Sequence, residues 1–260
     1  MVSPRTAALA EAYSMSSTST VSSPIESPAS SAGSPRLTPS MLFHAFADAV
    51  APAAGRLDKA KSVPCAGPDV KVQQDALAAI LVHAAFWDLT RRSVIRLEEV
   101  ERKVLFKTLR SMKVRVESTD VNAEVLDSLE QGIMKAALAL KGNGDVRSVV
   151  RGLYSGDAED PYRRAIAISN AAEIAAGLVR LDVEERHGLG KFRGRKETLV
   201  WLCDVVASHT AEFNATVREW ATDRDADRPA FDRLRKEIQH AIESRRETDR
   251  ESLLEAMSDD

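Results

Sequence analysis

The chain has 260 residues, of which 44% are hydrophobic and 29% charged, and a formal net charge of -3. This length and composition predict a soluble globular protein with a sizeable core, and the near-neutral charge argues against generic binding of nucleic acid, so any electrostatic function must come from local clustering. The two cysteines, Cys65 and Cys203, are far apart and predict no disulfide framework, and no apolar window is long enough to span a membrane.

Residues 1–36 are rich in serine, proline and alanine and contain few large apolar side chains. Such a segment cannot bury enough surface to offset the entropy lost on ordering, so we expect a disordered tail. Residues 37–260 are then expected to form one domain.

The first helix is expected over residues 38–51, with Thr38 or Ser40 as its N-cap. A longer helical pattern covers residues 73–89, and its apolar residues extend around most of the circumference, which predicts a central, buried helix. His83 lies within it and is expected to be a core histidine. The period then changes to alternation at Ile95 and Leu97 and at Met112, Val114 and Val116, which predicts two strands.

Helices are predicted again over the rest of the chain. They cover residues 123–140, ended by Gly142-Asn143-Gly144; residues 145–156, capped by Asp145; a segment opened by Pro161; residues 198–221; and residues 228–257. The predicted fold class is mostly α: a single helical domain with short antiparallel β-hairpins and a disordered N-terminal tail.

The chain contains no phosphate-binding loop, dinucleotide-binding GxGxxG, HExxH or GxSxG motif. Its five histidines and two cysteines are scattered and predict no metal site. We therefore expect no enzymatic activity and no cofactor.

The clearest local charge cluster is "RHGLGKFRGRK", residues 186–196, whose cations meet no acid until Glu197. The glycines indicate an exposed hairpin, and we expect its tip to face an anionic membrane, with two apolar residues inserting. The residues proposed to bind lipid here are Leu189, Lys191, Phe192, Arg193, Arg195 and Lys196. One alternative is a solvated basic turn packed against the acidic C-terminal helix. Nucleic-acid binding is not favoured, because a single aromatic provides no stacking platform.

Three blocks of this sequence resemble the Golgi phosphoprotein 3 family. They are "LTRRSVIRLE" (residues 89–98), "EVLDSLEQGI" (residues 124–133) and a Leu-x-Ser-Gly-acid turn followed by a proline-started helix, carried by Leu153, Ser155-Gly156-Asp157, Pro161, Asn170, Glu173, Ala176 and Leu178-Val179. With a possible counterpart of the family's first helix at residues 37–46, the resemblance extends from about Leu37 to Phe192.

The resemblance implies a helical peripheral membrane adaptor that binds phosphatidylinositol 4-phosphate on Golgi membranes. We expect a cytoplasmic protein, peripheral on Golgi membranes if the source is eukaryotic. Such adaptors recognise the cytosolic tails of glycosyltransferases, and they also recognise coat proteins. A homo-oligomer of the chain is also possible. The family's headgroup pocket uses a tryptophan and several arginines. Here the matching positions hold Ser169, Ala172 and Ala78 or Val82.

No tryptophan precedes the central helix, so lipid specificity does not carry over directly. We expect Arg163 and Arg164, in the first turn of the Pro161 helix, to supply what remains of an anion site. The alternative function is a helical protein–protein interaction scaffold that has lost lipid binding.

Overall fold

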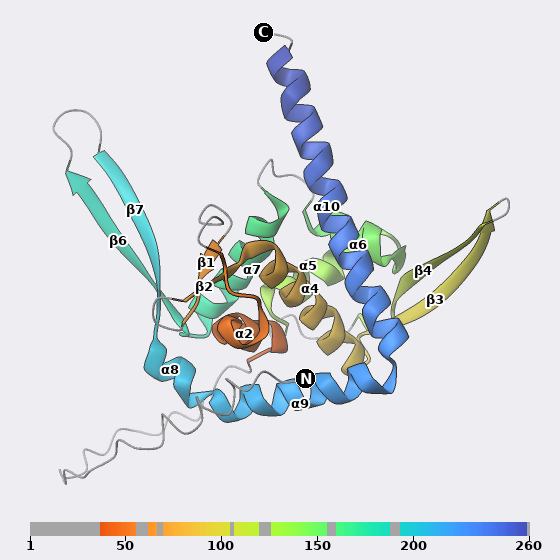
Figure 1. The fold of residues 1–260 in the computed structure, drawn as a ribbon, viewed down its shortest axis with the longest axis horizontal. Helices are drawn as coiled ribbons and strands as arrows, with labels where there is room; N and C mark the ends of the chain where they lie inside the picture. The colour runs from red at the N-terminus through yellow and green to blue at the C-terminus, as the bar shows by residue number, and fades with distance from the viewer. Residues whose placement is uncertain are drawn as a thin grey trace. The chain divides into compact units, whose positions relative to one another are not determined.

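The computed structural model describes residues 37–55, 62–66, 70–104, 107–119, 126–154, 160–187 and 193–258. The predicted disordered tail, residues 1–36, lies outside them. Within the described residues the fold is mostly helical with small antiparallel sheets, and one hydrophobic cluster runs from Leu37 to Ile242. The predicted fold class is therefore confirmed (Figure 1).

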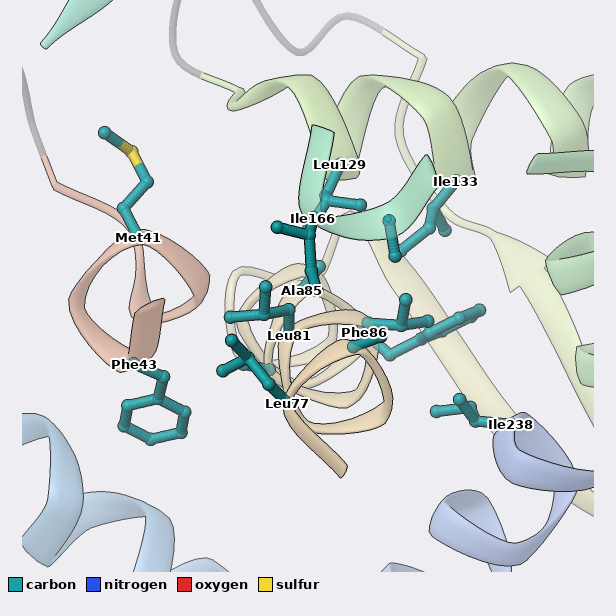
Figure 2. Packing of buried hydrophobic residues seen from close by; sticks show 14 of the residues in the cluster. Met41, Phe43, Leu77, Leu81, Ala85, Phe86, Leu129, Ile133, Ile166 and Ile238 are labelled. Carbon is teal, nitrogen blue, oxygen red and sulfur yellow. The ribbon is translucent and has the colours of Figure 1, made fainter. Parts of the chain in front are cut away.

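The core is organised around helix α4 (Gln74–Arg91), as the all-round apolar pattern predicted. Figure 2 shows α4 surrounded by apolar side chains from several other helices. These helices are α2 (Pro39–Ala45), α5 (Ser128–Ala139), α7 (Pro161–Ala175) and α10 (Arg228–Ser258). His83 is 2% exposed and packs against Trp220 and Phe231, and burial lowers its pKa to about 3, so it is a neutral core histidine.

The caps follow the predicted chemistry. Thr38 is the N-cap of α2, and its hydroxyl accepts a hydrogen bond from the Met41 N–H. Helix α5 begins later than predicted, at Ser128, because Asp127 adopts an extended backbone and forms a reciprocal capping box with Glu130. Asp145 caps helix α6 (Val146–Leu153) as expected.

The smaller elements near the N-terminus are helix α3 (Ala47–Val50) and the paired strands β1 (Ser62–Pro64) and β2 (Lys71–Gln73). The two strands predicted from alternation are confirmed and are longer than expected. They are β3 (Ile95–Val104) and β4 (Lys107–Val116), and β4 also pairs with the short strand β5 (Asn143–Asp145). Gly142, with a φ of 66°, allows the chain to turn from α5 into β5.

A second hairpin pairs β6 (Val179–His187) with β7 (Arg193–Trp201). The predicted helix over residues 198–221 is wrong at its start. Thr198–Trp201 complete β7, because Leu199 and Trp201 pair with Leu181 and Val179 across the hairpin. The helical segment then divides into α8 (Cys203–Ser208) and α9 (Thr210–Ala226) before α10.

A buried polar cluster joins α2, α4 and α5. Its three acids, which we call the carboxyl cluster, are Asp88, Asp127 and Glu130. The hydroxyls of Thr38 and Ser40 donate to Asp127, so the start of α2 is tied to the start of α5.

The charge balance of the carboxyl cluster requires a proton. Nη1 of Arg92 lies 3.4 Å from oxygens of both Asp88 and Glu130, so one guanidinium faces several carboxyl groups. Burial, together with the charges of Asp127 and Asp88, raises the pKa of Glu130 to about 9. Glu130 is therefore neutral at physiological pH.

Candidate functional site

The β6–β7 hairpin is fixed to the core at its base. Val179 is 3% exposed, and the ring of Trp201 packs edge-on against His44 with centroids 5.1 Å apart. Just beyond the strands, the Leu202 N–H donates to the Leu178 carbonyl at 2.9 Å. The hairpin can therefore project from the helices without losing its register at the base (Figure 1).

Beyond the base, the hairpin exposes an apolar strip formed by Leu181, Val183 and Leu199. Leu181 and Leu199 are directly opposite each other, and Val183 is two residues further along β6, so all three share one face of the ribbon. Their exposed fractions are 40%, 41% and 37%. We call these three residues the hairpin strip.

The charges of the hairpin are more balanced than the basic run indicated. The register places Glu184 opposite Lys196 and Glu185 opposite Arg195, so two cations of the basic run have acidic residues across the ribbon. Near the base, Arg180 forms an ion pair with Asp182 at 2.7 Å and lowers the pKa of that carboxyl. From Val179 to Trp201 the chain holds six cations and four acids, a net charge of +2.

The lipid-binding residues predicted in the hairpin divide into two groups. Leu189, Lys191 and Phe192 lie outside the described residues. Arg193, Arg195 and Lys196 occupy the first half of β7, next to the tip. The hairpin strip was missed from sequence. Its only signal in the sequence is the alternation of Val179, Leu181 and Val183, because the sequence pattern predicts a helix at the partner Leu199.

The alternative in which the basic segment packs against the C-terminal helix finds no support in the described strands. Figure 1 draws β6 and β7 well apart from α10, with the helical core between them. The helix that contacts β6 is α7.

Arg163 and Arg164 are placed elsewhere. Both are in the first turn of α7, whereas β6 follows the end of that helix, so roughly 18 Å of helix separates them from the hairpin base. The N-terminus of α7 also already has an anionic cap, because the Tyr162 N–H donates to the Asp160 carboxylate at 2.9 Å.

We therefore expect the Arg163→Ala/Arg164→Ala variant to bind anionic vesicles about threefold to tenfold more weakly than wild type. Two fully engaged cations would contribute about 1 kcal/mol each to the binding free energy. The expected weakening is smaller, because Asp160 offsets part of their charge. Sedimentation with anionic vesicles over a salt series measures it. Binding identical to wild type at every salt concentration would show that these arginines do not contribute to vesicle binding.

None of the positions that match the family's headgroup arginines holds a cation, and all of them except the half-buried Ala172 are buried. Ser169 is 2% exposed and donates to Glu173 at 2.9 Å, and the same Glu173 oxygen lies 2.6 Å from Nδ1 of His44. Ala78 and Val82 are fully buried in α4. A buried polar network and core packing occupy this region, so the described residues offer no headgroup pocket there.

No protein-family model matches the chain, and no curated protein or solved structure matches it significantly. In the part of the chain that the structure describes, no helix is long and apolar enough to cross a membrane. The same residues contain no group of three or more His, Cys, Asp or Glu side chains placed to hold a metal ion.

Proposed function

We propose that this protein is a peripheral membrane adaptor whose β6–β7 hairpin docks on an anionic lipid surface. The observation that carries the proposal is the hairpin strip. Leu181, Val183 and Leu199 are exposed on one face of a projecting ribbon, and the strand positions next to the tip hold Arg193, Arg195 and Lys196. An exposed apolar surface beside cations matches the chemistry of a membrane interface.

The expected strength is that of a reversible contact. The net charge of +2 contributes about 2 kcal/mol near an anionic leaflet. The three strip residues are already more than half covered, so each adds about 1 kcal/mol, and an inserted Phe192 adds roughly 1.5–3 kcal/mol. The total of roughly 6.5–8 kcal/mol corresponds to dissociation constants between about 20 µM and about 1 µM. A protein partner or a dimer would therefore be needed for long residence.

The adaptor part of the proposal rests on the resemblance to Golgi phosphoprotein 3 proteins. In that version the membrane is of Golgi type, the lipid is phosphatidylinositol 4-phosphate, and the partners are cytosolic tails of glycosyltransferases and coat proteins. Because the matching positions hold no cation, and Ser169, Ala78 and Val82 are buried, we propose that recognition is of anionic lipid in general, without a dedicated headgroup pocket of the family's kind.

The second candidate function is a helical scaffold that binds proteins and no lipid. The burial of Ser169, Ala78 and Val82, where the family has cations, favours it. The hairpin strip would then dock a partner protein.

Vesicle flotation separates the two functions. If the adaptor proposal is correct, the protein floats with vesicles containing phosphatidylserine, floats with those containing phosphatidylinositol 4-phosphate at equal charge, and stays behind with neutral vesicles. Stronger flotation with phosphatidylinositol 4-phosphate than with phosphatidylserine at matched charge would show that the protein has the family's lipid specificity. If the protein floats with no anionic vesicle at low salt, the result would support the function of a scaffold that binds proteins and no lipid.

A further inference from the structure

A pocket of about 480 Å³ lies between the first turns of α10, strand β4 and the start of α6. Four cations line it, namely Arg110, Arg147, Arg233 and Lys236, together with the acids Asp232 and Glu237. This volume is in the range of sites for small molecules. The pocket is formed by different elements from the β6–β7 hairpin, so its function is independent of the docking proposed above.

The floor of the pocket contains three buried polar atoms that have no hydrogen-bond partner in the described structure. They are Nε of Arg147, Nε of Arg233 and Oε2 of Glu237. The Glu237 side chain is held in place, because its other oxygen accepts the Met112 N–H of β4 at 3.1 Å, and the residue is only 3% exposed. Buried polar groups are nearly always paired, so their convergence on one pocket indicates that something bound there completes them.

The ion pairs around the pocket leave a surplus of positive charge inside it. Arg233 pairs with Glu99 at 3.1 Å, and Arg110 pairs with Glu101 at 2.6 Å. Asp232 forms ion pairs with Arg228 at 3.8 Å and with Arg235 at 3.5 Å.

Two of the lining cations, Arg147 and Lys236, have no ion pair with any residue that the structure describes. Lys236 is exposed at the rim, whereas Arg147 is half-buried at the floor. The acid opposite Arg147 is Glu237, and burial raises the pKa of that carboxyl. A ligand that is anionic and can also pair with Glu237 would therefore fit both the charge and the unpaired atoms.

We propose that this pocket binds the phosphomonoester group of a small phosphorylated molecule. The phosphate oxygens would accept hydrogen bonds from the Nε–H groups of Arg147 and Arg233, which suit phosphate geometry, and Lys236 would add charge at the rim. A monoprotonated phosphomonoester also carries one P–OH group that can donate to the free Glu237 oxygen. Sulfate has no proton to donate to an ionised Glu237, which distinguishes the proposed ligand from a generic anion.

The test uses the full chain and glycerol 3-phosphate, with sodium sulfate at equal ionic strength as the reference anion. Isothermal titration is expected to show saturable binding of glycerol 3-phosphate to wild type, and sulfate is expected to bind at least about tenfold more weakly. Arg147→Ala should weaken binding by about tenfold or more, and Lys236→Ala by a few-fold. The matched control is Arg151→Ala, one turn further along α6 and outside the pocket, which should bind like wild type.

Several results would overturn the proposal. One is the absence of saturable binding to wild type up to about 20 mM, well above the roughly millimolar dissociation constant of a weak site. Equal affinity for sulfate, or equal losses in Arg147→Ala and Arg151→Ala, would show only non-specific attraction. Lys236→Ala lies at the exposed rim, so it tests the site even if Arg147→Ala does not fold.

A second arm identifies the source of the phosphomonoester. Vesicles containing phosphatidic acid carry this group, whereas those containing phosphatidylserine do not. If a lipid headgroup occupies the pocket, glycerol 3-phosphate will release wild type from phosphatidic-acid vesicles and Arg147→Ala will show no such release. If flotation is the same with and without glycerol 3-phosphate while titration shows binding, the natural ligand is a soluble phosphomonoester.

Discussion

Glu130→Gln is expected to make the protein progressively more stable than wild type as the pH rises from about 5 to 8. The pKa of Glu130 is raised to about 9 in the folded protein, so the folded state holds a proton that the unfolded chain has lost above its ordinary value of 4.5. Unfolding of wild type between these values releases one proton, and the free energy of unfolding therefore falls by up to about 1.4 kcal/mol per pH unit from this group.

Glutamine removes that dependence without opening the carboxyl cluster. Its amide oxygen can accept the Asp127 N–H, which lies 3.1 Å from Oε2 of Glu130, and its NH₂ group can donate to Asp88 in place of the carboxyl proton. Relative to wild type, the variant should gain roughly 2–4 kcal/mol between pH 5 and pH 8.

Urea denaturation of both proteins at several pH values measures this difference directly. Glu243→Gln is the matched control, because Glu243 is an exposed carboxyl on α10, and its stability should follow the wild-type pH profile. Parallel profiles for wild type and Glu130→Gln would show that Glu130 is ionised in the folded protein.

Charge reversal in β7 is expected to abolish binding to anionic vesicles. Arg193→Glu/Arg195→Glu/Lys196→Glu changes the net charge of the hairpin from +2 to -4, and with about 1 kcal/mol per charge the partition coefficient should fall by at least about a hundredfold. Adding Phe192→Ser removes the aromatic group expected to insert. A separate variant, Leu181→Ser/Leu199→Ser, removes about 2 kcal/mol of apolar contact and should weaken binding by roughly thirtyfold at every salt concentration.

The control for total charge is Lys135→Glu/Lys141→Glu/Arg151→Glu, which reverses three exposed cations on or next to α5 and α6. It should float nearly as wild type does. Circular dichroism should be unchanged in all variants, because every substituted described residue except those in β7 is exposed in the structure, and the hairpin base is held by Val179 and Trp201. Equal loss of flotation in the control would indicate attraction by the whole protein surface.

The elements that sequence patterns predicted are those decided by local chemistry. Thr38 and Asp145 cap helices because their side chains reach nearby backbone N–H groups, and the apolar residues around most of the circumference of α4 require burial on most sides. Such local signals do not predict where β7 begins and ends, at Arg193 and Trp201. The segment from Thr198 is apolar enough for either a helix or a strand, and pairing with Val179–Asp182 decides between them.

The functional surfaces depend even more on tertiary contacts. The hairpin strip forms only with the register that places Leu199 opposite Leu181. In the sequence alone, the basic run predicts a site at the tip of the hairpin. The phosphate pocket combines Arg110, Arg147 and Glu237 from three separate elements, so no spacing in the sequence could indicate it. The Glu184 and Glu185 positions opposite cations of β7 became apparent only from the pairing.

The most direct test of the central claim is the depth of the hairpin strip in a bilayer. An environment-sensitive fluorophore is attached to a cysteine at position 181, after Cys65 and Cys203 are replaced by serine, and quenching by brominated lipid is measured on anionic vesicles. Position 138, an exposed leucine on α5, carries the same label as the control. The account predicts a blue-shifted emission and strong quenching at position 181 and neither at position 138. Flotation of the labelled protein with no quenching at position 181 would contradict it, because the protein would then bind membranes through another surface.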